Sequence, residues 1–365
     1  MRSLYDIVIK DKATKDSPAL SEYLFTEDEP TEFLSTNIIA LNLLYSGRVD
    51  GGIPIGRMSM ISAPSMLGKS FIAYGLVKNA QKRGMQVCII DTERAFSFQF
   101  AQAIGIDISP DKLVVLQENG IEDVSGIIMT IATQVEKEQR KNVFFVIDSW
   151  GALVTSKTLS NALVGNDAAD FTIPKKKNNL ANIMLNTKCT FFVVNHVYDN
   201  VGGMGDTMQV PGGRKIVFNS DCVVLGRSRA KEKKSASNPE IVGHLITAET
   251  YKSRFSREKS KLKFRIKVNG GLDIFYGILN DALEGGFVDV PKVGYCGRTH
   301  IKDDKPVKNT EIYTADFWLP VFNDTDFKQY LEKKYTFSNP LDIATEEEAL
   351  EVLNGNAPKK AGKKK

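Results

Sequence analysis

The sequence predicts an α/β fold with a mainly parallel central sheet covered by helices on both faces, an antiparallel extension, and a small α+β domain near the C-terminal end. Two observations lead to this prediction. Between residues 58 and 194, short apolar segments alternate with longer segments of helical periodicity, which is typical of parallel strands covered by helices. After about residue 215, strand-like segments follow one another closely, which indicates antiparallel neighbours.

The alternating region begins with the apolar segment MSMIS. Segments of this kind predict buried strands at 58–62, 87–90, 113–116, 143–147 and 190–194. Between them we expect helices at 70–83, about 122–140 and about 178–186. Gly84 follows the first of these helices, where glycine is common because it readily adopts the left-handed conformation.

In the later region the periodicity changes from helical to alternating. We expect short strands at 215–218, 221–228, 242–250 and 261–268. The last of these places Leu262, Phe264, Ile266 and Val268 on one side and only lysine or arginine on the other. Strict alternation predicts a half-buried strand with a basic, solvent-facing side. From about residue 273 the sequence, FYGILNDALEGG, predicts helix.

These patterns divide the chain into four parts. Residues 1–35 are polar and weakly periodic, and we interpret them as an N-terminal arm or small cap. Residues 36–272 form the core, and residues 273–354 form a small C-terminal domain. The basic tail, residues 355–365, has too little apolar surface to fold, so we expect it to be disordered.

The composition is that of an ordinary globular protein, with 42% hydrophobic and 25% charged residues in 365. No apolar run is long enough to cross a bilayer, and the N-terminus is charged where a signal peptide would be apolar. We therefore expect a cytoplasmic protein without a membrane partner. The four cysteines are far apart and form no CxxC pair, which argues against a zinc ribbon or a disulfide framework.

A phosphate-binding loop is predicted at residues 63–70, APSMLGKS. The segment matches GxxxxGK[ST] except that Ala63 replaces the first glycine, and it lies between an expected strand and an expected helix, as the motif requires. Lys69 would contact the β- and γ-phosphates of ATP, and the Ser70 hydroxyl would bind Mg²⁺. The rest of the nucleotide-binding loop is Ala63, Pro64, Ser65, Met66, Leu67 and Gly68.

Three other expected strands end in polar side chains that could complete the site. Asp148 ends the strand KNVFFVID, where P-loop proteins place a second Mg²⁺ anchor. Asp91 and Glu93 follow the strand CIID, and we prefer Glu93 as the group that activates the attacking water. Asn195 and His196 follow TFFVV, and a polar pair there indicates a sensor of the γ-phosphate. Strand ends in a parallel sheet meet at one ligand-binding edge.

Taken in this order, the motifs APSMLGKS, CIIDTE, FFVIDSWGAL and VVNH resemble those of the RecA-type recombinases, and most closely their phage branch. The resemblance covers about residues 30–290 and continues into KSRFSREKSKLKFRIKVNGGLDIFYG. It implies a RecA-like P-loop NTPase core and an Mg²⁺-dependent, DNA-dependent ATPase. It also implies helical filaments on single-stranded DNA and strand exchange with homologous duplex DNA, in recombination, repair and replication.

The resemblance also implies further roles for single residues and for the protein's partners. Phe100 would stack on adenine, His196 would sense the γ-phosphate, and Lys252 and Arg254 would reach the ATP of the neighbouring subunit. The N-terminal arm would serve filament polymerisation. Single-strand-binding and mediator proteins are candidate partners, and a phage protein of this kind would act in the host cytoplasm.

Two mobile DNA-binding loops would correspond to about residues 156–166 and 197–213. The second, VYDNVGGMGDTMQVPGG, is too glycine-rich for the interior of a helix or strand, and long loops inside compact domains are usually functional or disordered. Its apolar residues could insert between bases, and the basic pair that follows it could contact phosphates. The candidate DNA-binding residues are Val201, Gly202, Gly203, Met204, Met208, Gly212, Gly213, Arg214 and Lys215.

Two departures from the family pattern leave questions open. Ala63 leaves the exact turn of the phosphate loop in doubt. The tail is basic, whereas family tails are often acidic, and an acidic segment, EEEALE at 346–351, precedes it. Two other functions also stay open. One is a ring helicase with a RecA-like core, which should show an extra, primase-binding N-terminal domain and a differently placed arginine finger. The other is a DNA-binding module that uses ATP only as a conformational ligand, against which Glu93 and the intact GKS argue.

Overall fold

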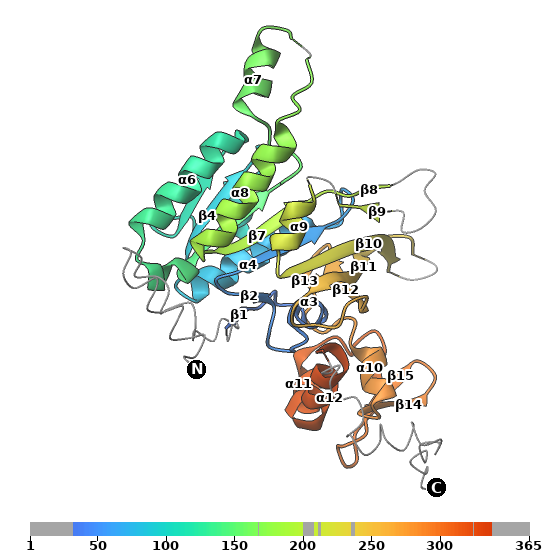
Figure 1. The fold of residues 1–365 in the computed structure, drawn as a ribbon. Coiled ribbons are helices and arrows are strands. Elements are labelled where there is room, and N and C mark those ends of the chain that lie inside the picture. Colours follow the sequence, from blue (N-terminus) through green and yellow to red (C-terminus); the bar gives the residue numbers. More distant parts are fainter. Residues whose placement is uncertain are drawn as a thin grey trace, which may run out of the picture. The chain divides into compact units, whose positions relative to one another are not determined.

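The computed structural model describes residues 32–166, 168–199, 208–210, 213–234, 238–323 and 325–337. The chain divides into two units, Met1–Glu32 and Phe33–Lys365. Within the described residues the largest sheet has nine strands in the order β13-β12-β11-β10-β3-β7-β6-β4-β5 (Figure 1). Its strands are β3 (Met58–Ser62), β4 (Gln86–Asp91), β5 (Leu113–Leu116), β6 (Val143–Asp148), β7 (Thr190–Asn195), β10 (Cys222–Lys233), β11 (Ile241–Ser253), β12 (Lys261–Lys267) and β13 (Gly271–Leu272).

The sheet is parallel from β10 through β3, β7, β6 and β4 to β5. Strands β11, β12 and β13 extend it with antiparallel pairs on the other edge. This arrangement confirms the predicted fold class, a mainly parallel sheet with an antiparallel extension. Because parallel strands are joined by crossover helices, both faces of this part of the sheet are covered and its strands are apolar on both sides.

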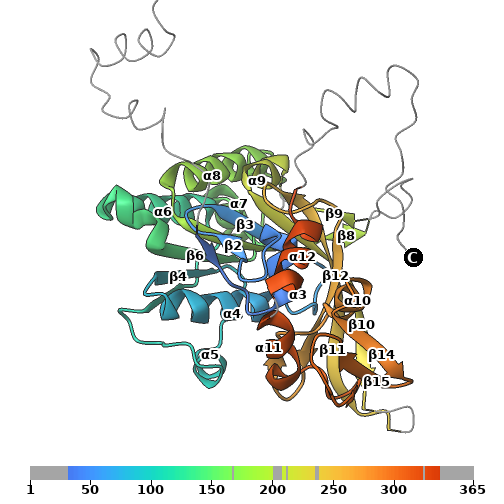
Figure 2. The same ribbon diagram turned by 90° about the horizontal axis from the view of Figure 1, so that it is seen from below.

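Two hydrophobic cores lie on opposite faces of the sheet, and successive residues of one strand contribute to different cores. Phe144 packs in the first core with helices α3 (Ile39–Ser46) and α4 (Lys69–Lys82). Phe145 packs in the second core with α6 (Ile121–Gln134) and α8 (Ile173–Thr187). Figure 2 shows α6 and α8 on one side of the sheet and α4 on the other. The alternation follows from the two-residue repeat of a strand.

Three predicted elements differ from the structure, and the first is the expected strand at 215–218. These residues lie in a short helix, α9 (Arg214–Asn219). Its Ile216 is buried in the second core, whereas Phe218 is exposed. A four-residue apolar segment is compatible with either element, so periodicity could not decide between them.

The helix expected at about 122–140 is also shorter than predicted. Helix α6 ends at Gln134, Val135 is extended, and a separate 3₁₀ helix, η1 (Lys137–Asn142), follows. The apolar stripe of α6 ends with Ala132, and no residue of η1 is buried. Without an apolar face to pack on the sheet, this polar segment gains nothing from continuing the helix.

The C-terminal part of the chain contains less helix near residue 273 than predicted. Only α10 (Leu279–Glu284) is helical there. It is followed by a three-stranded antiparallel sheet and two further helices. These elements are β14 (Val288–Lys292), β15 (Tyr295–Arg298), β16 (Val307–Lys308), α11 (Ala315–Asn323) and α12 (Thr325–Tyr335). Trp318 is buried among Phe275, Phe322 and Phe327, within the first core. The division into four parts stays a prediction.

The predicted basic side of β12 is only partly exposed. The guanidinium of Arg265 lies 4.9 Å from the ring centroid of Tyr276 and 4.5 Å from that of Tyr313, and it donates to the Asp273 carboxylate. Its side chain is 11% exposed. Contrary to the expectation for a solvent-facing residue, Arg265 therefore joins the sheet to the C-terminal elements.

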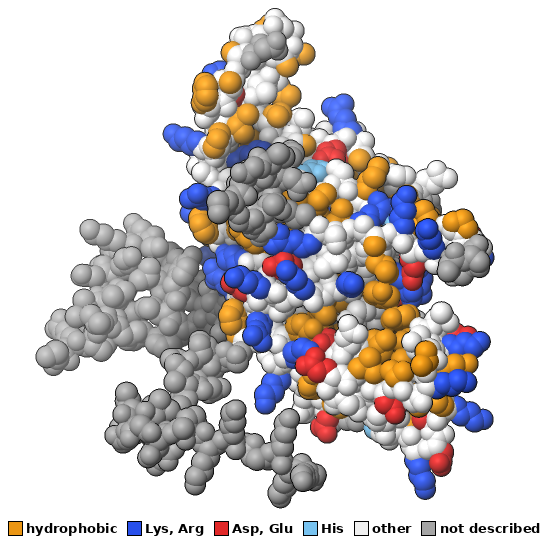
Figure 3. All heavy atoms as spheres, turned by 90° about the vertical axis from the view of Figure 1, so that its right-hand side faces the viewer, with side chains coloured by type: hydrophobic (Ala, Val, Ile, Leu, Met, Phe, Trp, Pro, Cys, Tyr) orange, Lys and Arg blue, Asp and Glu red, His pale blue; other side chains and the backbone are white. Residues whose placement is uncertain are grey.

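The shorter elements are β1 (Phe33–Leu34), β2 (Ile53–Pro54), α5 (Phe98–Ala103), α7 (Ser156–Leu163), β8 (Tyr198–Asp199) and β9 (Met208–Gln209). Helix α7 projects from the sheet (Figure 1), and several hydrophobic side chains are exposed among polar ones at the top of the space-filling view (Figure 3). Leu163, Val164 and Phe171 are strongly exposed in and after α7. No helix in the described part of the chain is long and apolar enough to cross a membrane.

Candidate nucleotide site

The predicted phosphate loop connects β3 to α4, as the motif requires. The loop residues Ser65 and Met66 are exposed, whereas Ala63 and Leu67 are buried. Gly68 has φ 75°, and a Cβ at this position would lie 2.3 Å from Cδ1 of Ile266. The left-handed backbone favours glycine, and a side chain here would have to displace the end of the Ile266 side chain. The loop is therefore held from behind by β12.

The replacement of the first glycine by Ala63 is accommodated in two ways. Ala63 is not among the described residues that have a positive φ, so its backbone does not require glycine. Its methyl group faces Gly226 of β10, where an added Cβ would lie 2.7 Å from that of Ala63 and 3.0 Å from Cδ2 of Leu67. The absence of a side chain at Gly226, in the neighbouring strand, thus leaves space for the methyl group of Ala63.

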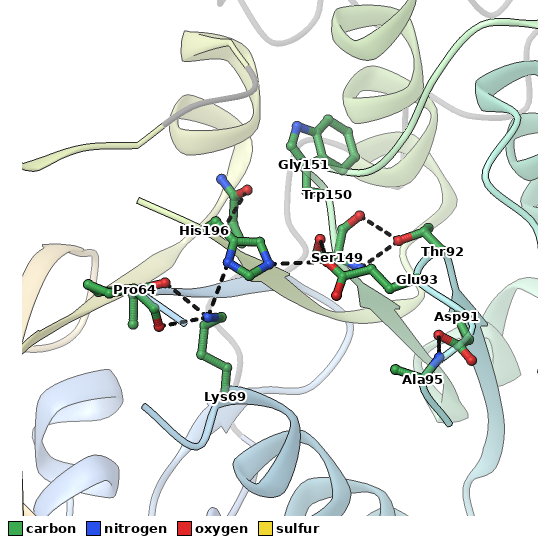
Figure 4. Close-up of polar contacts among 12 residues, drawn as sticks. Pro64, Lys69, Asp91, Thr92, Glu93, Ala95, Ser149, Trp150, Gly151 and His196 are labelled. Atoms are coloured by element: carbon green, nitrogen blue, oxygen red, sulfur yellow. Dashed lines mark hydrogen bonds and ion pairs between the residues drawn. The ribbon is translucent and has the colours of Figure 1, made fainter. Parts of the chain in front are cut away.

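Lys69, the first residue of α4, turns its ammonium group back toward the loop. Its Nζ donates to the carbonyl oxygens of Ala63 (2.9 Å) and Pro64 (3.0 Å), and it lies 3.5 Å from Nδ1 of His196 (Figure 4). Burial lowers the pKa of Lys69, while the carboxylates of Asp148 and Glu93 oppose that shift. The ammonium group is thus a buried cation beside the loop backbone.

Asp148, at the end of β6, lies next to Ser70. The Ser70 hydroxyl hydrogen-bonds the Asp148 carboxylate. Burial raises the pKa of Asp148, and the bond from Ser70 and the charge of Lys69 oppose that shift. The structure therefore brings together the two residues that the sequence selected for Mg²⁺. The peptide bond between Asp148 and Ser149 is cis.

Glu93, two residues beyond β4, accepts two hydrogen bonds on one carboxylate oxygen. Its Oε1 lies 2.5 Å from Oγ of Ser149 and 3.1 Å from Nε2 of His196 (Figure 4). Burial raises the pKa of Glu93, but the bonds from Ser149 and His196 and the charge of Lys69 outweigh it, and the pKa lies below its ordinary value. Glu93 is held as a carboxylate.

His196 bridges Lys69 and Glu93, and its two neighbours define its tautomer. An ammonium group has only donors, so Nδ1 must accept from Lys69, and Nε2 then carries the proton that is donated to Glu93. A change in the position of either neighbour would be transmitted through the imidazole ring. Because only Val197 separates His196 from β8, the ring also lies at the base of the 197–213 segment.

Asp91, the second carboxylate that the sequence offered as a base, has a different environment. Its two oxygens accept from the backbone N–H groups of Ala95 (3.0 Å) and Phe96 (2.9 Å). These bonds stabilise the turn that carries Glu93. The geometry therefore favours Glu93 as the candidate base, as the sequence analysis preferred.

Phe100, the predicted adenine-stacking residue, lies on α5 in a group of aromatic side chains. Its ring centroid is 5.9 Å from that of Phe71 and 6.1 Å from that of Tyr74. Both belong to α4, close to Ser70, and Phe100 itself is 41% exposed. The group presents an accessible ring near the start of α4. Its contact with a base stays a prediction.

Comparisons with known proteins identify the family of the chain. The family described as the RecA N-terminal domain matches residues 24–273, more than half of the chain. The chain belongs to the RecA family. A second match, to the C-terminal domain of the bacteriophage T4 recombination and repair protein UvsX, covers residues 275–331.

Individual RecA and phage T4 proteins are similar to this chain, in agreement with the two family matches. The recombination and repair protein of phage T4 is 25% identical over 98% of this chain and 93% of its own length. Protein RecA of Streptomyces venezuelae is 27% identical over 71% of this chain and 66% of its own length. Protein RecA of Clostridium acetobutylicum is 27% identical over 70% and 68%. The resemblance inferred from the motifs, including that to the phage branch, is confirmed.

The cation pair that the RecA resemblance implies, Lys252 and Arg254, lies away from the phosphate loop of its own chain. The main-chain N–H of Arg254 donates to the carbonyl of Asp221, whose own N–H donates to Met58, at the start of β3. The phosphate loop follows the other end of that strand. The pair therefore does not face Lys69 within one subunit.

Both cations have partners within the subunit. The Lys252 ammonium group donates to the carbonyl oxygens of Val217, Phe218 and Ser220, at the end of α9. Arg254 Nε lies 2.8 Å from Oδ1 of Asp221. The contact of either cation with another subunit's ATP stays a prediction.

In the residues that the structure describes, both segments that resemble the DNA-binding loops of RecA contain regular secondary structure. Residues 156–163 form the helix α7, so the first expected loop is mainly helical. In the second, β8 and β9 pair through Tyr198↔Gln209 and Asp199↔Met208. Gly213 and Arg214 are exposed and Lys215 is half-buried. The remaining candidates, Val201, Gly202, Gly203, Met204 and Gly212, lie outside the described residues, as does the side chain of Met208.

Three residues of this site were not predicted from the sequence. Ser149 directly follows Asp148, and the rule that polar residues at strand ends face the ligand could have selected it. Thr92, whose hydroxyl accepts from Ser149 N–H (2.6 Å), follows Asp91 in the same way. Gly226 carried no sequence signal, because its importance arises only from packing against Ala63.

Proposed function

We propose that this protein is an ATP-dependent DNA recombinase. It forms helical filaments on single-stranded DNA and catalyses homologous pairing and strand exchange with duplex DNA in recombination, repair and replication. The observation that carries the proposal is the convergence of Lys69, Asp148, Glu93 and His196, from four separate segments, at one edge of the sheet in a RecA-family chain.

The residues at this edge suit Mg²⁺ bound together with ATP. A hydroxyl and a carboxylate, those of Ser70 and Asp148, are the oxygen ligands that Mg²⁺ prefers, and Mg²⁺ usually takes few protein ligands beside substrate phosphates. No cluster of three or more His, Cys, Asp or Glu able to hold a metal occurs among the described residues, which fits a metal held jointly with a nucleotide. Bound Mg²⁺ would supply charge neutralisation on the β- and γ-phosphates.

Each of the protein's own groups would have a separate role in ATP hydrolysis. Lys69 would exchange its bonds to the loop carbonyls for bonds to phosphate oxygens, and the N-terminus of α4 would add its positive dipole. Glu93, as a carboxylate, would orient the attacking water and accept its proton. His196, hydrogen-bonded to Glu93, would respond to the γ-phosphate that Lys69 binds. Phe100 would stack on the adenine.

The position of Lys252 and Arg254 supports a head-to-tail assembly. They lie toward the opposite end of β3 from the phosphate loop, so a subunit would offer its cations on one surface and its ATP on another. A repeated contact between two different surfaces generates a ring or an open helix. An open helix fits the filament that we propose, with single-strand-binding and mediator proteins as candidate partners.

The deciding experiment measures ATP hydrolysis with and without single-stranded DNA, then strand exchange with a homologous duplex. We expect DNA-stimulated hydrolysis and joint-molecule formation that both require Mg²⁺. Lys69→Ala should remove both activities because it removes the charge that faces the phosphates. Lys78→Ala, on the same helix, is the matched control: its ammonium group caps the Ile104 carbonyl instead. Hydrolysis without strand exchange would contradict the recombinase proposal.

Imaging separates the proposal from its alternatives. With ATP and single-stranded DNA, helical filaments support a recombinase, whereas closed rings would indicate a helicase. A module that uses ATP only as a ligand would bind DNA in an ATP-dependent way without hydrolysing ATP. The matches to the RecA and T4 families do not favour either alternative.

A further inference from the structure

Lys177, in α8, is a buried lysine outside the nucleotide site described above. It is 6% exposed and lies on the buried side of α8 with Leu180, Ala181, Met184 and Thr187, none of which is charged. Its Nζ lies 3.0 Å from the carbonyl oxygen of Trp150 and 3.3 Å from that of Gly151. Burial alone lowers its pKa, to about 8. Burying this ammonium group therefore costs free energy, and the group donates to main-chain carbonyls.

The carbonyls that Lys177 binds are those of Trp150 and Gly151. They belong to the segment 149–151, which lies between Glu93 and His196. Ser149 donates to Glu93 on one side. On the other side, Gly151 lies against Asn195 and His196: a Cβ on Gly151 would be 3.6 Å from Asn195 Oδ1 and 3.9 Å from His196 Cδ2. Figure 4 shows this segment beside Glu93 and His196. One ammonium group therefore supports the backbone next to both residues.

Helix α8 also contacts the bases of both segments that resemble DNA loops. Asp170, just before α8, accepts from the hydroxyls of Thr155 and Thr172 and so closes the base of α7. Asn178, the neighbour of Lys177, lies 3.4 Å from where a Cβ on Gly213 would be. The start of α8 is thus joined to the base of α7 through Asp170, and Asn178 of α8 lies beside Gly213 at the end of the second segment.

Lysine is an energetically unfavourable residue for this buried position. Burying an ammonium group is costly, and an apolar residue of similar size is often neutral or stabilising at such a site. An apolar residue would, however, leave the two carbonyls without this donor. Lysine adds two directional hydrogen bonds, which tie α8 to the backbone of the hydrolysis site.

We propose that Lys177 is a positioning residue for ATP hydrolysis. It holds residues 149–151 against Glu93 and His196 and ties them to α8, and through α8 to the segments expected to contact DNA. The inference rests on the proposed ATPase activity and deepens it by naming how the DNA side would be linked to the hydrolysis site. It requires that Lys177 affect turnover and its stimulation by DNA, but not nucleotide binding.

The test compares Lys177→Met with Lys177→Arg and Lys176→Met. Methionine keeps the volume and removes the donors, whereas arginine keeps donors. Lys176 is the next residue of α8, and it pairs with Glu122 of α6 instead of the 149–151 backbone, which makes it the matched control. For Lys177→Met we expect ATP affinity within about twofold of the parent protein, and a fall of about tenfold or more in the kcat of DNA-stimulated hydrolysis. Lys176→Met should keep the parent kcat.

Several outcomes would overturn the inference. A parent-like kcat in Lys177→Met would do so, as would a loss of ATP affinity in step with kcat, since that would indicate general disruption. If Lys177→Met does not fold, as judged by its thermal transition, Lys177→Arg decides: activity above that of Lys177→Gln, which reaches less far, supports the role of a donor, and equal loss overturns it. The parent protein's own DNA-stimulated hydrolysis is measured beside them, so failure of the proposed function would be recognised separately.

Discussion

The methyl group of Ala63 faces the α-carbon of Gly226, and the two positions cannot both carry a side chain. A Cβ on Gly226 would lie 2.7 Å from that of Ala63, closer than atoms in a packed interior can approach. The residue that departs from the usual P-loop pattern is therefore matched by a glycine 163 positions later in the chain (226 − 63).

The first prediction follows from this pair. Gly226→Ala should displace the phosphate loop, weaken ATP binding and lower the free energy of unfolding by about 1–3 kcal/mol, because the added methyl group has no space. Ala63→Gly alone should have a small effect. The double substitution Ala63→Gly/Gly226→Ala should recover most of the lost affinity, which a double-mutant cycle on nucleotide binding and thermal unfolding would measure. An additive loss in the double variant would contradict the steric pairing.

Glu93→Gln should bind ATP and assemble on DNA but lose most of its turnover, by about 10²-fold or more, since the shape is kept and the base is removed. Steady-state hydrolysis and filament imaging measure the two properties separately. Turnover at the parent rate would show that another group activates the water.

The pH dependence of Glu93 follows from its lowered pKa. Because the folded-state pKa lies below the ordinary value, the ionised form is favoured in the fold. Its contribution to stability is complete above the ordinary pKa and is lost as pH falls through the lower, folded value. Turnover that depends on this carboxylate should therefore not decline between pH 7 and pH 5 on account of Glu93. Its acidic limb, measured as kcat/KM against pH in the parent protein, should lie below the ordinary value for glutamate.

Mixed filaments test the proposed sharing of ATP between subunits. Glu93→Gln and Lys252→Ala/Arg254→Ala should each be inactive alone and should partly recover hydrolysis when mixed, since some interfaces would then carry a complete site. The structure adds a control, because Lys252 also caps α9. Arg254→Ala alone leaves that cap intact and should be complemented in the same way. Absence of recovery at every ratio would contradict a shared site.

His196→Ala should uncouple ATP from DNA. The ring connects Lys69 to Glu93 and directly precedes the segment 197–213, so its removal should leave ATP binding nearly intact while ATP no longer strengthens DNA binding. The difference in DNA affinity with and without a non-hydrolysable ATP analogue, measured at fixed salt, gives the coupling directly. An unchanged difference would show that the signal takes another route.

Lys177 should make the free energy of unfolding rise with pH, whereas a cation paired with a carboxylate would make it fall as pH rises. Burial lowers its pKa to about 8 from 10.5, so between these values the unfolded chain binds more protons, and the stability cost of burying the ammonium group falls as pH rises. Lys177→Met should remove that rise and should be equal or up to about 1–3 kcal/mol more stable at pH 7, even though its turnover falls. Denaturant unfolding at pH 7 and pH 9.5 measures both effects. Strong destabilisation at pH 7 would indicate a mainly structural role.

The sequence by itself determined the parallel strands, the position of the phosphate loop, and the polar residues at strand ends that converge on it. These are local properties: a buried strand must be apolar over several residues, and a loop that binds phosphate needs Gly68, Lys69 and Ser70 in a fixed order. Chain topology then brings strand ends to one edge. Glu93 and Asp91 could both be selected in this way, because both follow the same strand.

What only the tertiary structure decided depends on partners distant in sequence. Asp91 binds main-chain N–H groups while Glu93 faces His196, and no local pattern distinguishes the two. Residues 215–218 form a helix because Ile216 packs in the second core and Lys252 caps the helix end. Gly226 matters only because Ala63 lies opposite it, and Lys177 only because the carbonyls of residues 150 and 151 meet it. Steric fit and hydrogen-bond satisfaction are set in three dimensions, so the sequence could show the candidates but not their partners.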